Sequence, residues 1–144
     1  MVRYSSGVIC VALPPVQLDR RNLRLMVARN TESMATAYTI TTDYKHGTST
    51  GISASVRAAT LRGLVDPRAQ PDDFNRPGHV FPLCARLGGV LARAGHTETA
   101  VDLTRLAGLK PGGALSKILT SSPPLAFGHR LRGKDGDSCG ATHA

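Results

Sequence analysis

The sequence predicts an α+β domain, and three observations support this class. Short runs of β-branched residues mix with amphipathic segments, but without the regular strand–helix–strand rhythm of a parallel α/β fold. The length of 144 residues favours one domain, and a chain of this size buries about two-thirds of its unfolded surface. Aromatic residues make up 4% of the chain and Trp is absent, so the core must consist of aliphatic side chains.

The N-terminal part of the chain predicts a strand, a short helix and a second strand. Residues 7–13, GVICVAL, are rich in β-branched residues and are typical of a buried strand. Residues 14–26 open with Pro at a plausible helix start and carry leucines at spacings that support a short helix. Residues 36–44 alternate in part and favour a strand, whereas residues 46–53 are a loop of Gly, Ser and Thr.

The middle of the chain contains the clearest helix. Residues 53–66 form a helical pattern with a rough apolar face, and Ser53 is a good N-cap. Residues 67–78 are expected to be a connector. Residues 79–85 are expected to form a strand, and its Pro82 predicts an edge position or a bulge because proline cannot donate to a sheet.

The C-terminal part predicts a turn, a helix and a final strand. Residues 88–95 are expected as a turn with a short extended piece, and residues 114–119 as a last strand. Residues 96–109 form the second strong helix, which Gly108 ends. The residues expected on its apolar side are Ala100, Val101, Leu103, Leu106 and Ala107. Residues 120–144 lack periodicity and are expected to be a flexible tail.

Charge and cysteine content limit the class of function. The formal net charge of +8 suits an anionic partner: a phosphorylated metabolite, a nucleic acid or an acidic surface. Three widely spaced cysteines without a C-x-x-C pair indicate neither a disulfide framework nor a zinc site, and they favour the reducing cytoplasm. The apolar run of residues 7–13 is too short for a membrane span and lacks a signal-peptide layout, so no membrane partner is expected.

Two Gly-His segments are the candidate functional motifs: RPGHVFPL at 76–83 and RAGHTETAVDL at 93–103. The second places Arg93 and Gly95 at a predicted helix N-terminus, where unpaired amides and the helix dipole favour an anion. Arg93 could donate two bonds to a phosphate, and Gly95 would let a ligand approach the backbone. His96 could bind a metal or transfer a proton, and Thr97 could add a hydroxyl.

A structural interpretation of the same residues remains open at this point. Thr97 could simply cap the helix, Glu98 could interact with the helix dipole, and His96 could be a surface residue. His79, which precedes an apolar strand, could equally be a structural histidine or a catalytic one.

Four segments and their spacing resemble one enzyme family. These are GVICVAL, TSTGISASVRAAT, DDFNRPGHVFPL and GGVLARAGHTETAVDLTRLAGLKPGG. Together they resemble 3,4-dihydroxy-2-butanone 4-phosphate synthase over roughly residues 5–115, and the two histidine motifs in combination are specific for that family. The resemblance implies a mixed-sheet α/β sandwich that forms a homodimer.

The resemblance also implies an activity and its residues. The family converts ribulose 5-phosphate to 3,4-dihydroxy-2-butanone 4-phosphate and formate with Mg²⁺ or Mn²⁺, for riboflavin biosynthesis. Forming an enediol beside a carbonyl needs general acid–base groups and a Lewis acid. By resemblance, His79 would be catalytic and His96 a metal ligand. The residues implied to line the substrate are Arg93, Ala94, Gly95, His96, Thr97, Cys10, Thr48, Thr50 and Ser53.

The chain departs from the family pattern at both ends. By the resemblance, the family carries an acidic loop, D-R-E-N-E-G-D, well upstream of the strand expected here at residues 7–13, and Lys117 stands where the family has a glutamate. We therefore expect a partial synthase domain over 1–119, truncated at both ends, and a divergent tail over 120–144. A fragment of a longer protein, such as one fused to a GTP cyclohydrolase II domain, is one possible origin.

Two other functions remain open from the sequence. One is a remnant that binds a sugar phosphate without catalysis. The other is a nucleic-acid-binding module, which the net charge suggests. The scattered basic residues and the lack of an aromatic platform or a reading motif speak against the nucleic-acid module.

Overall fold

A computed structural model describes residues 1, 5, 7–49 and 51–118. The chain divides into two compact units, Ile9–Leu115 and a second unit made of Met1–Val8 with Ser116–Ala144. In the second unit, the Ser116 hydroxyl donates to the Val8 carbonyl at 2.8 Å. The predicted tail over 120–144 lies outside the described residues.

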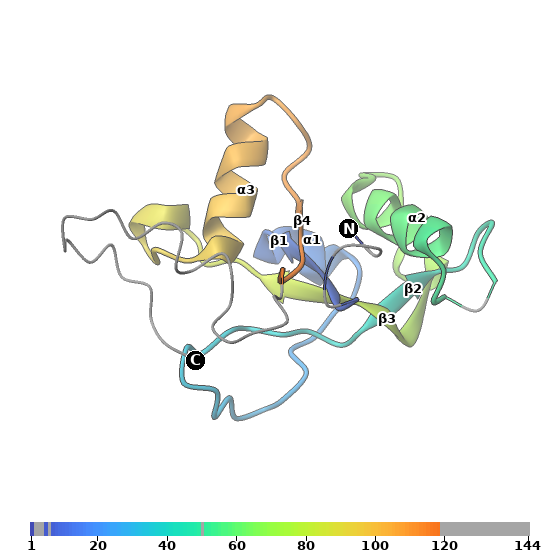
Figure 1. The fold of residues 1–144 in the computed structure, drawn as a ribbon, viewed down its shortest axis with the longest axis horizontal. Helices are drawn as coiled ribbons and strands as arrows, with labels where there is room; N and C mark the ends of the chain where they lie inside the picture. The colour runs from blue at the N-terminus through green and yellow to red at the C-terminus, as the bar shows by residue number, and fades with distance from the viewer. Residues whose placement is uncertain (2–4, 6, 50, 119–144) are drawn as a thin grey trace. The chain divides into compact units, whose positions relative to one another are not determined.

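The unit Ile9–Leu115 contains four strands, three α-helices and two 3₁₀ turns among its described residues (Figure 1). In chain order they are β1 (Ile9–Leu13), α1 (Pro15–Arg20), β2 (Thr42–Tyr44), α2 (Ala54–Val65), η1 (Pro71–Asp73), β3 (Phe74–Cys84), η2 (Gly89–Leu91), α3 (His96–Leu106) and β4 (Gly113–Leu115). No helix within the described part of the chain is both long and apolar enough to cross a bilayer.

The sheet is mixed and has the order β2-β3-β1-β4. β1 runs parallel to β3, with Ile9 opposite Val80 and Leu13 opposite Cys84. β4 pairs with β1 and β2 pairs with β3, both antiparallel. A mixed sheet with helices packed on it confirms the predicted α+β class.

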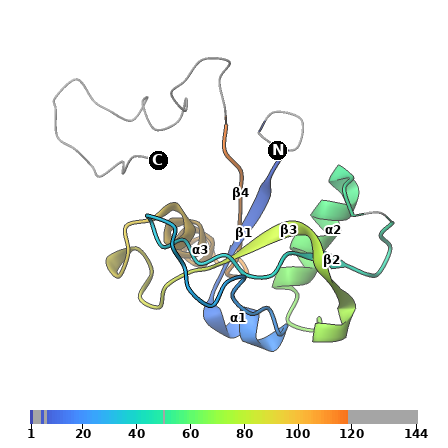
Figure 2. The same cartoon turned by 90° about the horizontal axis from the view of Figure 1, so that it is seen from below.

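Each face of the sheet carries its own hydrophobic cluster. Figure 2 shows α3 on one side of the strands and α2 on the other. Because side chains alternate along a strand, Val11 and Leu13 point to one face while Ala12 points to the other. The first cluster consists of Val11, Leu13, Leu18, Leu23, Leu64, Phe74 and Val80, so α1 and α2 contribute to it. The second cluster is smaller and brings Val101 of α3 against Ala12 and Ala85.

The predicted helix over 53–66 is confirmed as α2. The Ser53 side chain caps it by accepting the Val56 N–H at 3.2 Å. Thr60 on this helix accepts the Tyr44 backbone N–H at 3.0 Å, which attaches α2 to the edge strand β2.

Strand β3 corrects two predictions. It begins at Phe74, so the second half of the expected connector 67–78 is strand. It lies between β1 and β2, so an edge position for Pro82 is wrong. The irregularity occurs instead at residues 76–79, because Thr42 pairs with Val80 while the next residue, Asp43, pairs with Asn75. The four residues between these pairs bulge away from regular pairing.

Several other elements are shorter than predicted. The expected helix over 14–26 ends at Arg20, since Asn22 takes a left-handed φ of 51°. The expected strand over 36–44 is regular only at Thr42–Tyr44, although Tyr38 bridges Leu83. The expected extended piece within 88–95 is the 3₁₀ turn η2.

Helix α3 confirms the expected helix and part of its expected apolar side. Its buried residues are Thr97, Glu98 and Val101, whereas Leu103 and Leu106 are 61% and 84% exposed. Ala100 and Val101 pack against Ala12 and Ala85, so the side of α3 that meets the sheet carries these small apolar residues and the buried Glu98. Gly108, with a φ of 68°, follows the helix end as predicted.

The two leucine environments predict a contrast in stability. Leu64→Ala should lower the free energy of unfolding by about 2–5 kcal/mol, since Leu64 is fully buried in the larger cluster. Leu106→Ala, at an exposed site, should change it by about 0.5 kcal/mol or less. Urea denaturation followed by circular dichroism measures both, and equal losses would contradict the core described above.

Candidate active site

A histidine–aspartate pair lies where β2 meets the bulge of β3. The His79 ring Nδ1 is 2.6 Å from Oδ2 of Asp43, and the His79 backbone N–H donates to Oδ1 at 3.0 Å. The Asp43 side chain is 10% exposed and the His79 side chain 43% exposed. The buried carboxylate therefore holds both the backbone and the ring of His79, by one bond each, and leaves Nε2 as the ring nitrogen available to a ligand.

Gly51 packs directly on this pair. Its φ of +84° is a left-handed conformation that favours glycine, and a Cβ built here would collide with Oδ2 of Asp43 and Nδ1 of His79. The loop before α2 thus closes over the Asp43 side of the pair only because residue 51 lacks a side chain.

Asp43 is a site residue that no sequence motif indicated. It lies in TAYTITTDY, whose pattern predicts a strand and no functional role. A lone carboxylate in a strand rich in Thr and Ile is a usable signal, because an acidic residue buried in a sheet needs a partner. That partner, His79, is 36 residues further along the chain.

An arginine–glutamate pair forms the second part of the candidate site. Nη1 of Arg93 is 2.8 Å from Oε2 of Glu98, whose side chain is 1% exposed. Oε1 of Glu98 accepts the Arg86 backbone N–H at 2.9 Å, and Nη2 of Arg93 donates to the Met34 carbonyl at 3.2 Å. Glu98 is therefore a buried partner of Arg93 and not a surface residue facing the helix dipole.

The residues between Arg93 and Glu98 form the start of α3. Gly95 is the N-cap residue and provides no side-chain cap, so the prediction that Thr97 caps the helix is wrong. Thr97 is buried in the first turn, while Ala94 and His96 are exposed. A Cβ at Gly95 would lie 2.5 Å from Nη1 of Arg93 and 2.6 Å from Oε2 of Glu98. Gly95 therefore makes room for the Arg93–Glu98 pair.

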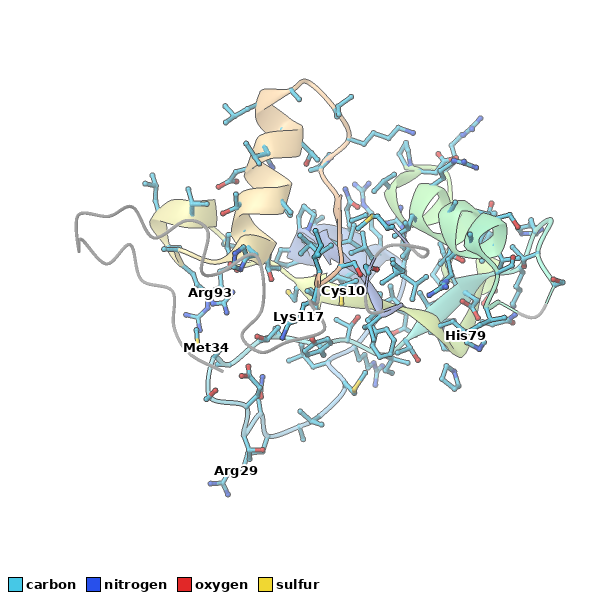
Figure 3. The ribbon with its side chains drawn as sticks, viewed as in Figure 1. Cys10, Arg29, Met34, His79, Arg93 and Lys117 are labelled. Atoms are coloured by element: carbon cyan, nitrogen blue, oxygen red, sulfur yellow. The ribbon has the colours of Figure 1, made fainter. Side chains whose placement is uncertain are left out.

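Cys10 lies between the two pairs, on the sheet face that carries α3. It pairs with Phe81 and Leu115, and it is half-buried. Figure 3 shows Arg93 and His79 on opposite sides of Cys10. Burial and, secondarily, the neighbouring Cys10 raise the pKa of the Tyr38 phenol. The predicted residues thus do not form a single tight cluster.

The loop predicted to line the substrate has internal roles where the structure describes it. The Thr48 hydroxyl donates to the carbonyls of Tyr44 and Lys45. The Ser53 hydroxyl caps α2 and contacts the Ser55 hydroxyl at 3.0 Å. Thr50 lies outside the described residues. Substrate contacts by Thr48, Thr50 and Ser53 remain predictions.

The described residues include no group of three His, Cys, Asp or Glu side chains arranged to hold a metal ion. His96 lines a shallow groove between α3 and β4 together with Thr99, Ala100 and Leu115. The carboxylates on the same helix are engaged: Glu98 by Arg93, and Asp102 by the Val90 N–H at 2.8 Å. These residues alone do not fit a magnesium site, because Mg²⁺ prefers oxygen ligands.

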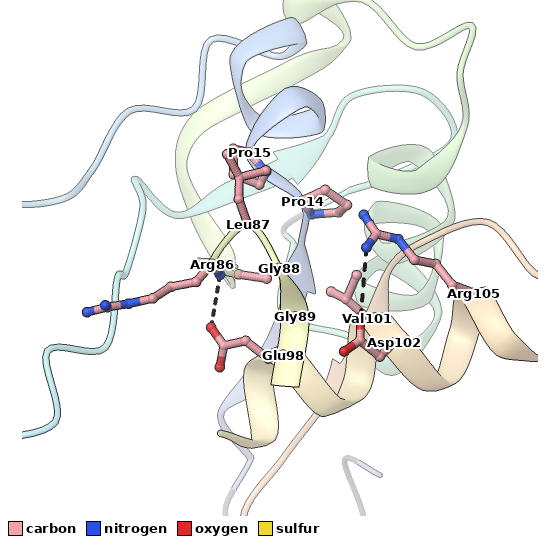
Figure 4. A pocket seen from close by; sticks show the side chains of 11 residues that line it. Pro14, Pro15, Arg86, Leu87, Gly88, Gly89, Glu98, Val101, Asp102 and Arg105 are labelled. Carbon is pink, nitrogen blue, oxygen red and sulfur yellow. Dashed lines mark hydrogen bonds and ion pairs between the residues drawn. The ribbon is translucent and has the colours of Figure 1, made fainter. Parts of the chain in front are cut away.

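A small pocket beside Glu98 is lined by backbone, apolar and paired charged groups (Figure 4). Within it, Arg105 lies 3.8 Å from Asp102, and Glu98 accepts the Arg86 amide. Its carboxylates are thus already occupied, so this pocket is packing around the start of α3.

A carboxylate-centred loop is held by Arg93. Glu32 accepts bonds from the Ser33 hydroxyl and from the Met34 and Thr36 amides at 3.1, 2.9 and 2.8 Å. The two backbone N–H bonds are the main reason that the pKa of Glu32 falls from 4.5 to about 2. The Asn30 side chain closes the turn by donating to the Thr36 carbonyl at 2.9 Å.

Glu32→Gln tests this loop through its pH dependence. The pKa of Glu32 is lower in the folded chain than in the unfolded chain, so its charge stabilises the fold at pH values above the unfolded pKa of 4.5. This stabilisation is lost as the pH falls toward the folded pKa of about 2. The urea midpoint of the unsubstituted chain should therefore exceed that of Glu32→Gln at pH 6, and the difference should shrink as the pH falls below about 4. A difference independent of pH would show that the charge of Glu32 does not act.

Two glycines provide a matched test of the histidine–aspartate pair. Gly51→Ala should displace the His79 ring, whereas Gly47→Ala should not, because a Cβ at Gly47 meets nothing within 4 Å. Both residues have positive φ, so both variants carry a similar backbone cost of about 1–2 kcal/mol. Side-chain NMR signals of His79 measure the effect, and an equal change in both variants would refute the contact.

A mixed α+β sheet bearing a His–Asp pair and an Arg–Glu pair at a helix start defines a candidate acid–base site for an anionic ligand. The chain matches the family model of 3,4-dihydroxy-2-butanone 4-phosphate synthase over residues 1–137. The chain belongs to this family. The match confirms the family that the two histidine motifs resemble.

Named relatives agree with this assignment. The chain is 51% identical over 126 residues to the 3,4-dihydroxy-2-butanone 4-phosphate synthase of Agrobacterium fabrum, covering 88% of this chain and 59% of the relative. It is 53% identical over 129 residues to the riboflavin biosynthesis protein RibBA of Mycobacterium tuberculosis, covering 90% of this chain and 30% of that protein. The chain thus spans less than two-thirds of these relatives.

Solved structures of the family share the fold. A 3,4-dihydroxy-2-butanone 4-phosphate synthase in complex with two magnesium ions superposes with a TM-score of 0.82 and 48% identity, covering 88% of this chain and 59% of that one. The synthase of Candida albicans gives a TM-score of 0.77 at 47% identity, covering 83% and 58%.

Proposed function

We propose that the chain acts in riboflavin biosynthesis as a lyase, converting D-ribulose 5-phosphate to 3,4-dihydroxy-2-butanone 4-phosphate and formate. The observation that carries the proposal is the His79–Asp43 pair, a half-exposed imidazole oriented by a buried carboxylate. Membership of the synthase family supports the reaction and its substrate.

His79 would be the proton-transfer group. With Nδ1 donating to Asp43, the neutral imidazole presents Nε2 as a base, which suits removal of a proton beside the substrate carbonyl. Asp43 would hold the ring in this tautomer and stabilise it once protonated, as buried carboxylates do for catalytic histidines. Asp43 is thus a positioning residue in this mechanism.

The start of α3 would hold the substrate phosphate. The first-turn amides of an α-helix lack intrahelical partners and attract anions, and His96 and Thr97 supply such amides. Gly95 is the N-cap, its N–H donates to the Arg93 carbonyl at 2.8 Å, and Ala94 and Gly95 would flank the phosphate. Arg93 uses two donors on Glu98 and Met34, and a guanidinium has five. Its remaining donors could reach the phosphate, and Cys10, Thr50 and Ser53 would lie along the rest of the substrate.

The proposed reaction implies a divalent metal, Mg²⁺ or Mn²⁺, which would polarise the substrate oxygens. A family member has been crystallised with two magnesium ions. His96 is the candidate ligand here, but its described neighbours supply no free carboxylate. The oxygen ligands would therefore have to come from substrate, water or a second copy of the chain.

We propose a homodimer as the working form, because a second copy could supply such ligands. We place it in the cytoplasm, which the wide spacing of the cysteines favours.

A remnant that binds the sugar phosphate without turnover is the second candidate. The observation that favours it is Lys117, a cation at the position where the resemblance implies a family glutamate. The two candidates share a substrate and differ only in turnover, so one assay separates them.

Formate release from ribulose 5-phosphate with Mg²⁺ tests the proposal. His79→Ala should lower kcat by about 10²- to 10⁴-fold, the usual contribution of a general acid–base group, and Asp43→Asn should lower it less. His46→Ala is the control, because His46 forms a separate surface pair with Asp73 at 2.7 Å and should not affect turnover.

Turnover by the unsubstituted chain that survives His79→Ala would overturn the assigned role. Binding of ribulose 5-phosphate without any formate at high protein concentration would favour the remnant.

A further inference from the structure

The carboxylate of Glu98 is a buried charged group that the proposed mechanism leaves without a role. Its side chain is 1% exposed, and both of its oxygens are used. One holds the Arg86 backbone amide and the other holds Arg93. Burying a carboxylate is costly unless it is paired and hydrogen-bonded, so a glutamate at this position requires both partners.

Arg93 connects Glu98 to a distant part of the chain. Its Nη2 donates to the carbonyl of Met34, 59 residues away in sequence. Met34 belongs to the loop over residues 30–36, where Glu32 holds the Met34 and Thr36 amides. This loop leads directly into Tyr38, which bridges β3 and neighbours Cys10.

We propose that Glu98 is a positioning residue for the sugar-phosphate site: its buried carboxylate fixes the Arg93 guanidinium and, through it, the loop over residues 30–36. The inference rests on the proposed function for its ligand. Glu98 itself does not touch the substrate. It leaves Arg93 with donors for a phosphate while removing the freedom of that long side chain.

The chemistry of the pair explains why a carboxylate is needed. A glutamine would offer one carbonyl oxygen in place of two acceptors, so it could not accept from both Arg86 and Arg93 through separate oxygens. A lysine at position 93 is a point charge without a planar fork, so it could not bind Glu98 and the Met34 carbonyl together. Either change should therefore loosen the loop over residues 30–36, although Glu98 itself makes no contact with the substrate.

Two measurements on the full chain test the proposal: the dissociation constant of ribulose 5-phosphate by calorimetry, and amide hydrogen exchange of Met34 and Thr36. Glu98→Gln and Arg93→Lys should both raise the dissociation constant by about tenfold, which corresponds to one charge-assisted hydrogen bond. Both should also speed exchange in the loop. Glu98→Asp, which keeps two acceptor oxygens, should recover part of each effect.

Asp102→Asn is the matched control. Asp102 lies on the same helix, accepts the Val90 backbone amide and pairs with Arg105, and among the described residues these contacts do not reach the loop over residues 30–36. It should lower stability while leaving loop exchange and binding unchanged. If Glu98→Gln does not fold, Arg93→Lys and Glu98→Asp are compared with Asp102→Asn in loop exchange and ribulose 5-phosphate binding.

Equal effects of Asp102→Asn and Glu98→Gln would overturn the proposal, because Glu98 would then act only through general stability. The proposal would also be overturned if the variants exchange the loop amides faster but the unsubstituted chain does not bind ribulose 5-phosphate. Binding with the predicted pattern but no formate release would support the proposal while the lyase function fails.

Discussion

The parallel pairing of β1 with β3 is the interaction on which the rest of the structure depends. It places Cys10 beside Phe81 and leaves one sheet face to α1 and α2 and the other to α3. β2 pairs with β3 in two registers, Thr42 with Val80 and Asp43 with Asn75, so residues 76–79 of β3 bulge between these pairs. The bulge brings the His79 amide and ring onto Asp43. Pairing in the sheet core thus determines where the candidate base lies.

Two buried carboxylates are used in the same way at the two parts of the site. Asp43 and Glu98 each accept one backbone amide with one oxygen and bind one side chain, His79 or Arg93, with the other. A glycine packs against each pair, so neither carboxylate is separated from its partner by a side chain. Both oxygens being satisfied is what makes burial of these charges tolerable. The site is therefore built from a hydrogen-bonded His79–Asp43 pair and an Arg93–Glu98 salt bridge inside a sheet and helix scaffold.

The strands, helices and histidine motifs could be predicted from local pattern, whereas the partners of the site residues could not. The N-cap residue Ser53 predicts α2 and the run GVICVAL predicts β1, because helix capping and β-branched runs depend on only a few neighbouring residues. The contact between Asp43 and His79 spans 36 residues and depends on a bulge that no local pattern encodes. Likewise Leu103 and Leu106 fit the apolar spacing of α3, but both are exposed in the folded chain. In both cases contacts between distant segments, and not local periodicity, decide which residues are paired or buried.

The central claim is that the two Gly-His segments serve one sugar phosphate. The most direct test is a titration of the isotope-labelled chain with ribulose 5-phosphate and Mg²⁺, followed by amide NMR shifts. The account predicts that residues 79–81 and residues 94–98 respond together, with one dissociation constant. Shifts confined to one segment, or spread over the scattered basic residues and equally produced by inorganic phosphate, would contradict it.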